Sequence, residues 1–165
     1  MKYSLLCFCI VIVYSCKHIE HVMSRNDATQ GNDSAGLSLL NADKSWSERA
    51  AQKGYYHSRS DFASDSAIDM LEGEMPLYGR KAIEQYALTQ ADSALTMNWK
   101  PLRYGVAASG ELGYTFGAWT MHTKTKQQKD TVLYGDYITV WKKNTDRTWK
   151  YVVDGGNTTP KPVEQ

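Results

Sequence analysis

The chain of 165 residues has little of what marks the non-globular classes of protein. It contains only four prolines and twelve glycines, which excludes a collagen-like chain. Neither sign of charge dominates, because 19 basic residues stand against 18 acidic ones. This balance argues against a nucleic-acid-binding protein, which needs a basic surface. Hydrophobic residues make up 42% of the chain, which is enough for one domain with a proper core.

Cysteine is absent after position 16, and long apolar runs are absent throughout. The three cysteines are Cys7, Cys9 and Cys16. The longest apolar run, Leu5 to Tyr14, has ten residues, whereas a membrane-spanning helix needs about 20. Once the first fifteen residues are removed, a single cysteine remains, which excludes disulfides and a CxxC redox motif.

The first sixteen residues have the layout of a bacterial export signal. Lys2 precedes the apolar run, and Val13-Tyr14-Ser15-Cys16 follows it. This ending resembles a lipobox, in which the cysteine becomes the first mature residue and carries the lipid. An ordinary signal peptide with a chance cysteine and an uncleaved anchor are the alternatives. We expect a lipoprotein signal peptide over 1–15, lipidation of Cys16, and a chain held at the cell envelope, facing the periplasm or the exterior.

The rest of the chain divides into a tether, a domain and a tail. Residues 16–36 are polar and have little to bury, which predicts a flexible tether. After Cys16, every aromatic residue lies between Trp46 and Tyr151. We therefore expect the folded domain to cover residues 37–157 and a C-terminal tail to cover 158–165.

The hydrophobic pattern predicts helices first and a sheet second. Helical spacing places Leu39, Asp43, Trp46 and Ala50 on one face of a helix that ends near Gly54. A short helix over 55–63, a strand over 67–71, an edge piece over 75–78 and a helix over 79–91 follow. The remaining residues predict a meander of four strands over 99–109, 114–124, 132–142 and 148–154. This order indicates an α+β domain with an antiparallel sheet.

The order of these elements, together with several short motifs, resembles the SnoaL-like subgroup of the nuclear-transport-factor-2-like superfamily. The resemblance covers about 120 residues, in keeping with one domain. The matching pieces are Leu40-Asn41-Ala42-Asp43 with Trp46 and Gly54, Phe62-Ala63-Ser64-Asp65, Tyr78-Gly79-Arg80-Lys81-Ala82-Ile83, Ser109-Gly110-Glu111-Leu112-Gly113-Tyr114-Thr115, Tyr137-Ile138-Thr139-Val140-Trp141, and Trp149-Lys150 followed by Asp154-Gly155-Gly156-Asn157.

The resemblance implies a cone-shaped fold like that of ketosteroid isomerase. A strongly curved antiparallel sheet would wrap the N-terminal helices, and a pocket would open at the wide end. The resemblance does not fix a reaction, because this fold hosts isomerases, cyclases, dehydratases, hydrolases and non-catalytic binders.

Three titratable residues are candidates for catalysis. Asp43 stands where the helix pattern expects an apolar residue, and burial there would raise its pKa and suit it to be a base. The alternative is that it binds backbone N–H groups or an indole and so ties the helix to the sheet. Asp154 ends an apolar strand and would work at the mouth of the pocket, or else cap the following turn. His57 lies in the short second helix, where it would shuttle a proton or face the solvent.

Four aromatic residues on the predicted strands are candidates for ligand binding. They are Tyr114, Trp119, Tyr137 and Trp141. Tyrosine hydroxyls can donate to a developing oxyanion beside a carboxylate base, as in ketosteroid isomerase. The alternative is that these rings fill the core or an interface.

The sequence leaves two functions open. The first is a membrane-anchored domain that binds a small apolar or neutral molecule, with isomerisation, cyclisation, dehydration or hydrolysis by an Asp base as the reactions open to it. The second is a non-catalytic module of the cell envelope that binds a ligand or a protein, either a second copy of itself or an envelope partner. No P-loop, dinucleotide-binding or serine-triad motif is present, and we expect no cofactor, no metal ion and no nucleic acid.

Overall fold

The computed structural model describes residues 34–90 and 95–164. The predicted signal peptide, Cys16 and most of the predicted tether therefore lie outside the described residues. Within the described ranges, no helix combines the length and the apolar character needed to cross a membrane.

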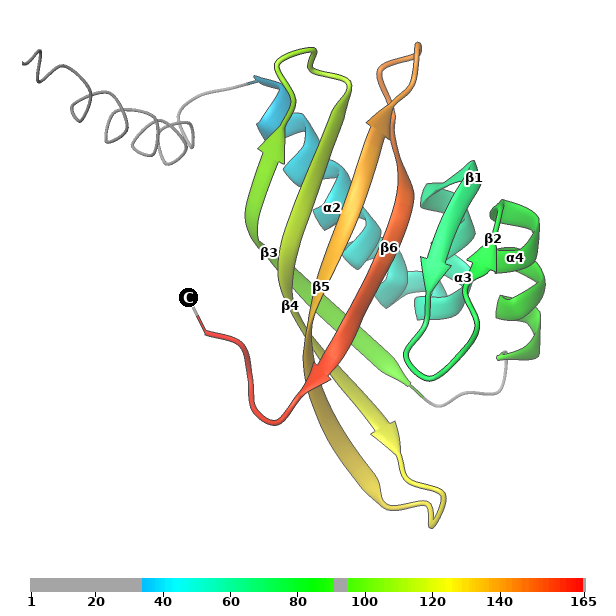
Figure 1. Ribbon diagram of the computed structural model, residues 1–165. Coiled ribbons are helices and arrows are strands. Elements are labelled where there is room, and N and C mark those ends of the chain that lie inside the picture. Colours follow the sequence, from blue (N-terminus) through cyan, green and yellow to red (C-terminus); the bar gives the residue numbers. More distant parts are fainter. Residues whose placement is uncertain (1–33, 91–94, 165) are drawn as a thin grey trace, which may run out of the picture. The chain divides into compact units, whose positions relative to one another are not determined.

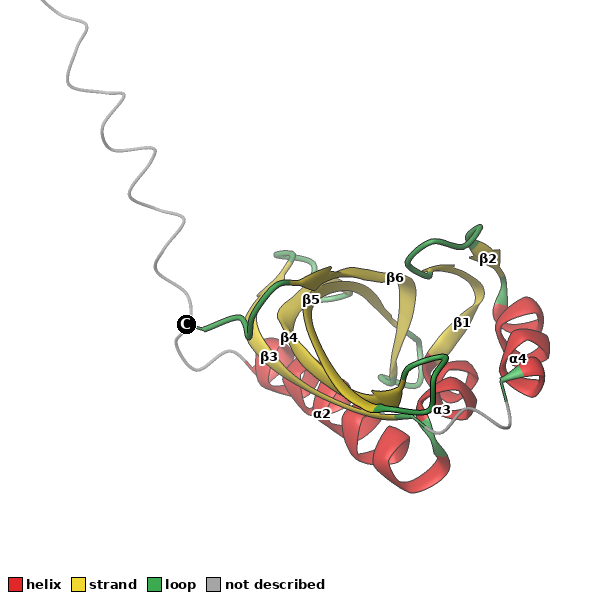
Figure 2. Cartoon of the chain, turned by 90° about the horizontal axis from the view of Figure 1, so that it is seen from below, coloured by secondary structure: helices red, strands yellow, loops and turns green. Residues whose placement is uncertain are grey.

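Within residues 34–90 and 95–164, three helices cover one side of the sheet (Figures 1 and 2). The first is α2 (Ser34–Lys53), which begins three residues earlier than the domain boundary expected at Leu37. Its buried stripe contains Leu39, Asp43, Trp46 and Ala50, as the spacing predicts. Gly54, at φ 91°, separates α2 from α3 (Tyr55–Phe62), and Gly79, at φ 86°, precedes α4 (Arg80–Thr89). Glycine adopts these positive φ values without steric cost, so both helices start sharply.

The sheet has six strands in the order β2-β1-β6-β5-β4-β3. It curves strongly around α2 and stays open between β2 and β3, as Figures 1 and 2 show. The predicted α+β cone fold is confirmed. The strands are β1 (Ala63–Met70), β2 (Leu77–Tyr78), β3 (Thr96–Val106), β4 (Leu112–Lys124), β5 (Asp130–Lys143) and β6 (Trp149–Thr159).

Two features of the sheet differ from the sequence-based expectation. The sheet is mixed, because β1 pairs with β6 in parallel while the other pairs are antiparallel. The chain between β1 and β6 is long enough for such a crossover. In addition, β6 does not end at Asp154 but continues to Thr159. Gly156 permits this, since an added Cβ there would lie 2.2 Å from the carbonyl oxygen of Asp136.

The core divides into two clusters on the concave face of the sheet. The larger cluster joins α2, α4 and the sheet, and it includes Leu39, Trp46, Ile83, Trp141 and Tyr151. The smaller cluster contains Met97, Trp119 and Tyr137. The larger cluster is packed with stacked rings. The ring centroids of Trp46 and Tyr151 lie 4.9 Å apart, at an interplanar angle of 10°. The second cluster borders a cavity.

Two glycines let the aromatic rings of the smaller cluster lie flat on the sheet. Gly117 pairs with Tyr137 across β4 and β5, and Gly135 pairs with Trp119 on the same strands. A Cβ on Gly117 would lie 2.5 Å from the Tyr137 ring, and one on Gly135 would lie 2.1 Å from the Trp119 ring. A side chain at either position would push the facing ring into the cavity.

Candidate functional site

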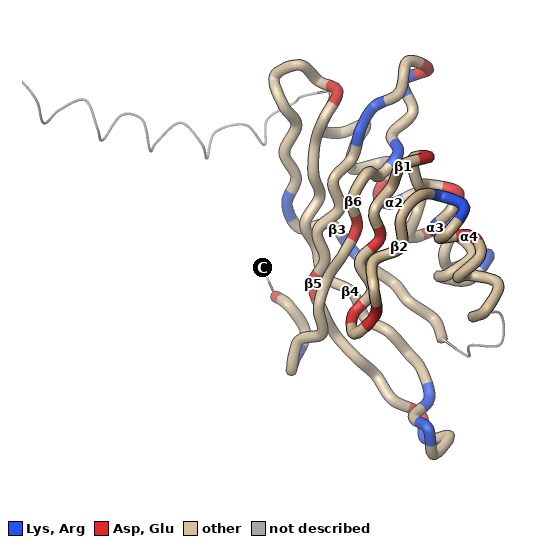
Figure 3. Tube along the Cα trace, turned by 45° about the vertical axis from the view of Figure 1, so that its right-hand side comes forward, with Lys and Arg blue, Asp and Glu red and all other residues tan. Residues whose placement is uncertain are grey.

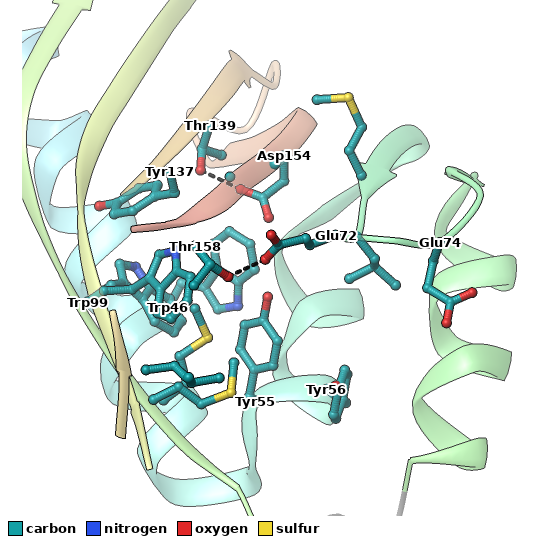
Figure 4. A pocket seen from close by; sticks show the side chains of 18 of the residues that line it. Trp46, Tyr55, Tyr56, Glu72, Glu74, Trp99, Tyr137, Thr139, Asp154 and Thr158 are labelled. Carbon is teal, nitrogen blue, oxygen red and sulfur yellow. Dashed lines mark hydrogen bonds between the residues drawn. The ribbon is translucent and has the colours of Figure 1, made fainter. Parts of the chain in front are cut away.

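A cavity of about 360 Å³ opens between the concave face of the sheet, α3 and the β1–β2 loop (Figure 4). This volume lies within the range of small-molecule sites. The lining residues come from every element except β2. They are Trp46, Tyr55, Tyr56, Met70, Leu71, Glu72, Glu74, Tyr86, Met97, Trp99, Trp119, Met121, Leu133, Tyr137, Thr139, Asp154, Gly155, Gly156 and Thr158.

The inner wall of the cavity is aromatic and rigidly packed. Trp46 is stacked between Tyr151 and Phe62, with Phe62 5.9 Å away. Trp99 packs edge-on against Trp46 at 5.3 Å between ring centroids. The indole of Trp119 donates to the carbonyl oxygen of Asp136 at 3.0 Å. Because these rings are held by neighbours, the cavity is preformed rather than created by a ligand.

Asp154 is the most buried carboxylate that lines the cavity, and only 8% of it is exposed. The parallel pairing of β1 and β6 places it directly beside Asp69, which is fully buried. One carboxylate oxygen accepts a hydrogen bond from the Thr139 hydroxyl at 2.6 Å. Two buried carboxylates on neighbouring strands repel each other and need a cation between them.

Arg59 of α3 supplies that cation. Its Nε donates to Asp69 at 2.7 Å, and its Nη2 donates to the other oxygen of Asp69 and, at 3.5 Å, to Asp154. The Tyr151 hydroxyl adds a donor to Asp69 at 3.1 Å. Asp69 therefore holds the guanidinium in the two-pronged geometry that arginine and carboxylate favour. Asp154, by contrast, is contacted by Nη2 alone, through one long hydrogen bond.

Burial raises the pKa of Asp154 above its usual range, while Arg59 and the Thr139 hydrogen bond oppose that rise. A carboxylate with a raised pKa holds a proton more strongly and is a better base near neutral pH. One arginine faces two carboxylates here, so the cluster carries a net negative charge whenever both are ionised.

Tyr55 connects this cluster to the open cavity. Its hydroxyl oxygen accepts a hydrogen bond from Arg59 Nη1, and the guanidinium carbon lies 4.8 Å from the ring centroid. Burial raises the pKa of Tyr55 to about 12, so the phenol stays protonated at neutral pH. Within the described part of the chain its proton takes part in no hydrogen bond, and the hydroxyl points into the cavity toward the carboxylates of Glu72 and Asp154 (Figure 4). It is therefore available as a donor to a ligand.

Glu72 closes the opposite side of the cavity. It belongs to the loop between β1 and β2, and its carboxylate accepts a hydrogen bond from the Thr158 hydroxyl at the end of β6. Figure 4 shows its carboxylate and that of Asp154 pointing toward each other. The extension of β6 beyond Asp154 thus places a second carboxylate over the cavity.

Asp43 lies deeper and does not line the cavity. It is fully buried, and its carboxylate accepts hydrogen bonds from Trp99 Nε1 at 2.9 Å and from the Tyr137 hydroxyl at 3.1 Å. Burial raises its pKa to about 6, against hydrogen bonds from Thr115, Tyr137 and Trp99 that lower it. The pKa of Tyr137 is raised in turn by burial and by the Asp43 charge. These bonds link helix α2 to strands β3 and β5.

The structure gathers some of the predicted site residues and separates others. Asp154, Trp119 and Tyr137 line the cavity, and Asp43 lies behind Tyr137. Trp141 is fully buried in the larger core cluster, where its indole donates to Thr115 at 2.9 Å. Tyr114 and His57 are exposed and lie outside the cavity.

Four residues of the site escaped the sequence analysis: Tyr55, Arg59, Asp69 and Glu72. One usable signal for Arg59 and Asp69 was present in the sequence. Each is a charged residue inside a predicted helix or strand, over 55–63 and 67–71, that packs on one side against the rest of the domain. Their placement beside Asp154 depends on the parallel pairing of β1 and β6, which no local pattern encodes. The described residues contain no group of three or more His, Cys, Asp or Glu side chains placed to hold a metal ion.

Comparison with solved structures shows the same fold in several bacterial proteins. A ketosteroid isomerase-like protein from Erwinia carotovora is 12% identical, with a TM-score of 0.63 over 76% of this chain and 97% of that one. A hexachlorocyclohexane dehydrochlorinase is 14% identical, with a TM-score of 0.64 over 78% and 90%. At such identities the likeness establishes the fold alone. No family model matches the chain, and neither does any curated protein.

A third similar structure is a Xanthomonas campestris protein described as a calcium/calmodulin dependent protein kinase II association domain. It is 15% identical, with a TM-score of 0.61 over 74% of this chain and 86% of that one. The three proteins have different names, so the shared fold does not indicate one function.

Proposed function

We propose that the domain binds a small molecule in this cavity and transfers a proton on it, with Asp154 as the base. The observation that carries the proposal is the placement of Asp154. It is a buried carboxylate on the wall of a preformed cavity, with Tyr55 as a protonated donor beside it. The similar fold of a ketosteroid isomerase-like protein and of a dehydrochlorinase supports the proposal, since both names refer to reactions of small molecules.

The proposed step needs no cofactor. The Asp154 carboxylate accepts a proton from a carbon next to a carbonyl group, and the C–H electron pair moves into a new C=C bond. The carbonyl oxygen gains the negative charge and accepts a hydrogen bond from Tyr55, which Arg59 polarises. Return of the proton to another carbon gives an isomer, whereas loss of a leaving group gives an elimination product.

The experiment has two stages. Thermal-shift screening of the full chain against steroid-like, polyketide-like and sugar-derived carbonyl compounds selects ligands. Proton NMR in D₂O then follows deuterium entry at the carbon next to the carbonyl. We expect Asp154→Asn to slow this exchange by about 10²-fold or more, and Asp43→Asn to leave it within a few-fold of wild type. Equal exchange in wild type and Asp154→Asn would refute the role of Asp154.

We also propose that Cys16 carries a lipid that holds the domain at the surface of a bacterial membrane. The lipobox-like Val13-Tyr14-Ser15-Cys16 supports this proposal. Cys16→Ser should abolish labelling of the full chain by a fatty-acid analogue in a bacterial host. Labelling that persists in Cys16→Ser would refute it.

One observation favours a second function, homodimer formation through the convex face of the sheet. Leu112, Tyr114 and Ile138 are each more than 40% exposed there, on the antiparallel strands β4 and β5. The name of the Xanthomonas protein, an association domain, is consistent with such a role. Sedimentation velocity should show a dimer that Ile138→Lys converts to a monomer, whereas a wild-type monomer would exclude this function.

A further inference from the structure

We infer that the cavity selects small organic cations, either amines or quaternary ammonium ions with an apolar body, over neutral and anionic molecules of the same shape. This inference rests on the proposed function, because it names the class of ligand that the same cavity takes. It departs from the expectation of a neutral ligand, which came from the balanced charge of the whole chain.

The charge on the cavity wall is of one sign. Glu72, Glu74 and Asp154 line the cavity, and no Lys, Arg or His is among the described residues that do. Figure 3 shows acidic positions on the β1–β2 loop, whereas basic positions gather at the tip of the β4–β5 hairpin. A cleft with walls of one charge concentrates ligands of the opposite charge. An anion would meet the carboxylates of Asp154 and Glu72 and no cationic side chain among the described lining residues.

The nearby guanidinium does not compensate for this charge. Arg59 is only 2% exposed, and its donors are directed to Asp69, Tyr55 and the edge of Asp154. Asp69 is fully buried and takes two of those donors. Arg59 therefore offsets only one of the two carboxylate charges, and the net negative charge of the cluster is left for a ligand to balance.

The two facing carboxylates define where a cationic group would lie. Asp154 points into the cavity from β6, and Glu72 points toward it from the β1–β2 loop (Figure 4). Thr158 fixes Glu72, and Thr139 fixes Asp154, so neither carboxylate is free to turn away without breaking a hydrogen bond. A cation that lies between them pairs with both negative charges.

The other walls of the cavity suit the remainder of such a ligand. Seven of the lining residues are aromatic: Trp46, Tyr55, Tyr56, Tyr86, Trp99, Trp119 and Tyr137. Aromatic faces attract ammonium groups, and Tyr55 already contacts one cation, Arg59, in this way. The thioethers of Met70, Met97 and Met121 add an adaptable apolar surface for hydrocarbon.

The test is a set of three probes of one shape and different charge. Benzyltrimethylammonium is the cation, neopentylbenzene is its neutral isostere, and phenylmethanesulfonate is the anion. NMR titration of the full chain gives each dissociation constant. We expect the cation to bind at least tenfold more tightly than the neutral isostere, and the anion not to saturate. Glu72→Gln should weaken cation binding at least threefold and leave the neutral isostere unchanged.

A matched control removes the same charge elsewhere. Glu111→Gln, in the exposed turn between β3 and β4, should leave the binding of all three probes unchanged. Equal binding of cation and neutral isostere, or tightest binding of the anion, would overturn the charge selection while leaving a small-molecule site in place. Saturation by none of the probes would also overturn the inference, and the proposed proton transfer would then be judged by deuterium exchange alone.

Discussion

Two buried aspartates in this domain lie in opposite surroundings. Asp43 accepts hydrogen bonds from neutral donors, the indole of Trp99 and the phenol of Tyr137, behind the cavity wall. Asp154 lies on the wall itself, in a charged cluster with Arg59 and Asp69. Burial raises the pKa of both. A raised pKa therefore does not distinguish a structural carboxylate from a functional one, whereas access to a cavity and the charge of the partners do.

The largest expected change in stability comes from removing the charge of Asp69, the most deeply buried carboxylate of the cluster with Arg59 and Asp154. Asp69→Asn leaves the Arg59 guanidinium without its two-pronged partner in a site closed to water. Loss of one partner of a buried ion pair costs about 3–5 kcal/mol. Urea denaturation should show a fall of that size in the free energy of unfolding.

The control for this prediction is an exposed aspartate with an arginine partner. Asp65 is 96% exposed and lies 3.1 Å from Arg80. Asp65→Asn should change the free energy of unfolding by less than about 1 kcal/mol, as is usual for surface pairs. Equal effects of the two substitutions would mean that the buried Arg59–Asp69 pair contributes no more to the free energy of unfolding than the exposed pair does.

The stability that Asp43 contributes, together with its donors Trp99 and Tyr137, should depend on pH. The pKa of Asp43 is about 6 in the folded state, above the ordinary 3.8, so the folded state binds a proton more tightly than the unfolded chain does. The contribution of this group is present in full below pH 4 and is lost as the pH rises to about 6. The loss amounts to about 3 kcal/mol.

Comparison of wild type with Asp43→Asn isolates this contribution. The stability of wild type relative to Asp43→Asn should fall by about 3 kcal/mol between pH 4 and pH 7, measured by chemical denaturation at each pH. A difference between the two proteins that does not change with pH would contradict the raised pKa of Asp43.

The smallest expected effect is a difference between the Asp154 and Asp43 variants in their affinity for a cationic ligand. Asp154→Asn removes the charge from the cavity wall, and we expect it to weaken benzyltrimethylammonium binding about tenfold, or about 1.4 kcal/mol. Asp43→Asn removes a charge that does not reach the wall, and we expect less than a twofold change. Calorimetric titration of both variants checks this, and a larger effect of Asp43→Asn would reverse the assignment.

More of the fold than of the candidate site could be predicted from the sequence. Helical spacing placed Leu39, Asp43 and Trp46 on one buried face, and the structure confirms that face. Asp154 stood out because it ends an apolar strand. An indole was one of the partners expected for Asp43, and Trp99 supplies it. Which residues would reach the two aspartates was not predictable, because Trp99, Tyr137 and Arg59 lie far from them in the chain.

Glycine was a signal of mixed value, because Gly54 and Gly79 indicated helix boundaries that the structure confirms, whereas other glycines misled. Gly155-Gly156 indicated the end of a strand, whereas in the structure these residues let β6 run on beneath Met70 and beside β5. That extension brings Thr158 to Glu72 and so completes the acidic side of the cavity. A glycine required by close packing and a glycine required by a turn look the same in a single sequence.

Carbon-13 NMR of the aspartate carboxyl groups tests the distinction between Asp43 and Asp154 most directly, with the two Asn variants used for assignment. On addition of benzyltrimethylammonium, the Asp154 resonance should shift and the pKa of Asp154 should fall, because the bound cation stabilises its charged form. The pKa of Asp43 should stay near 6. A response of Asp43 alone, or saturable binding that moves neither resonance, would contradict the assignment of Asp154 as the functional carboxylate.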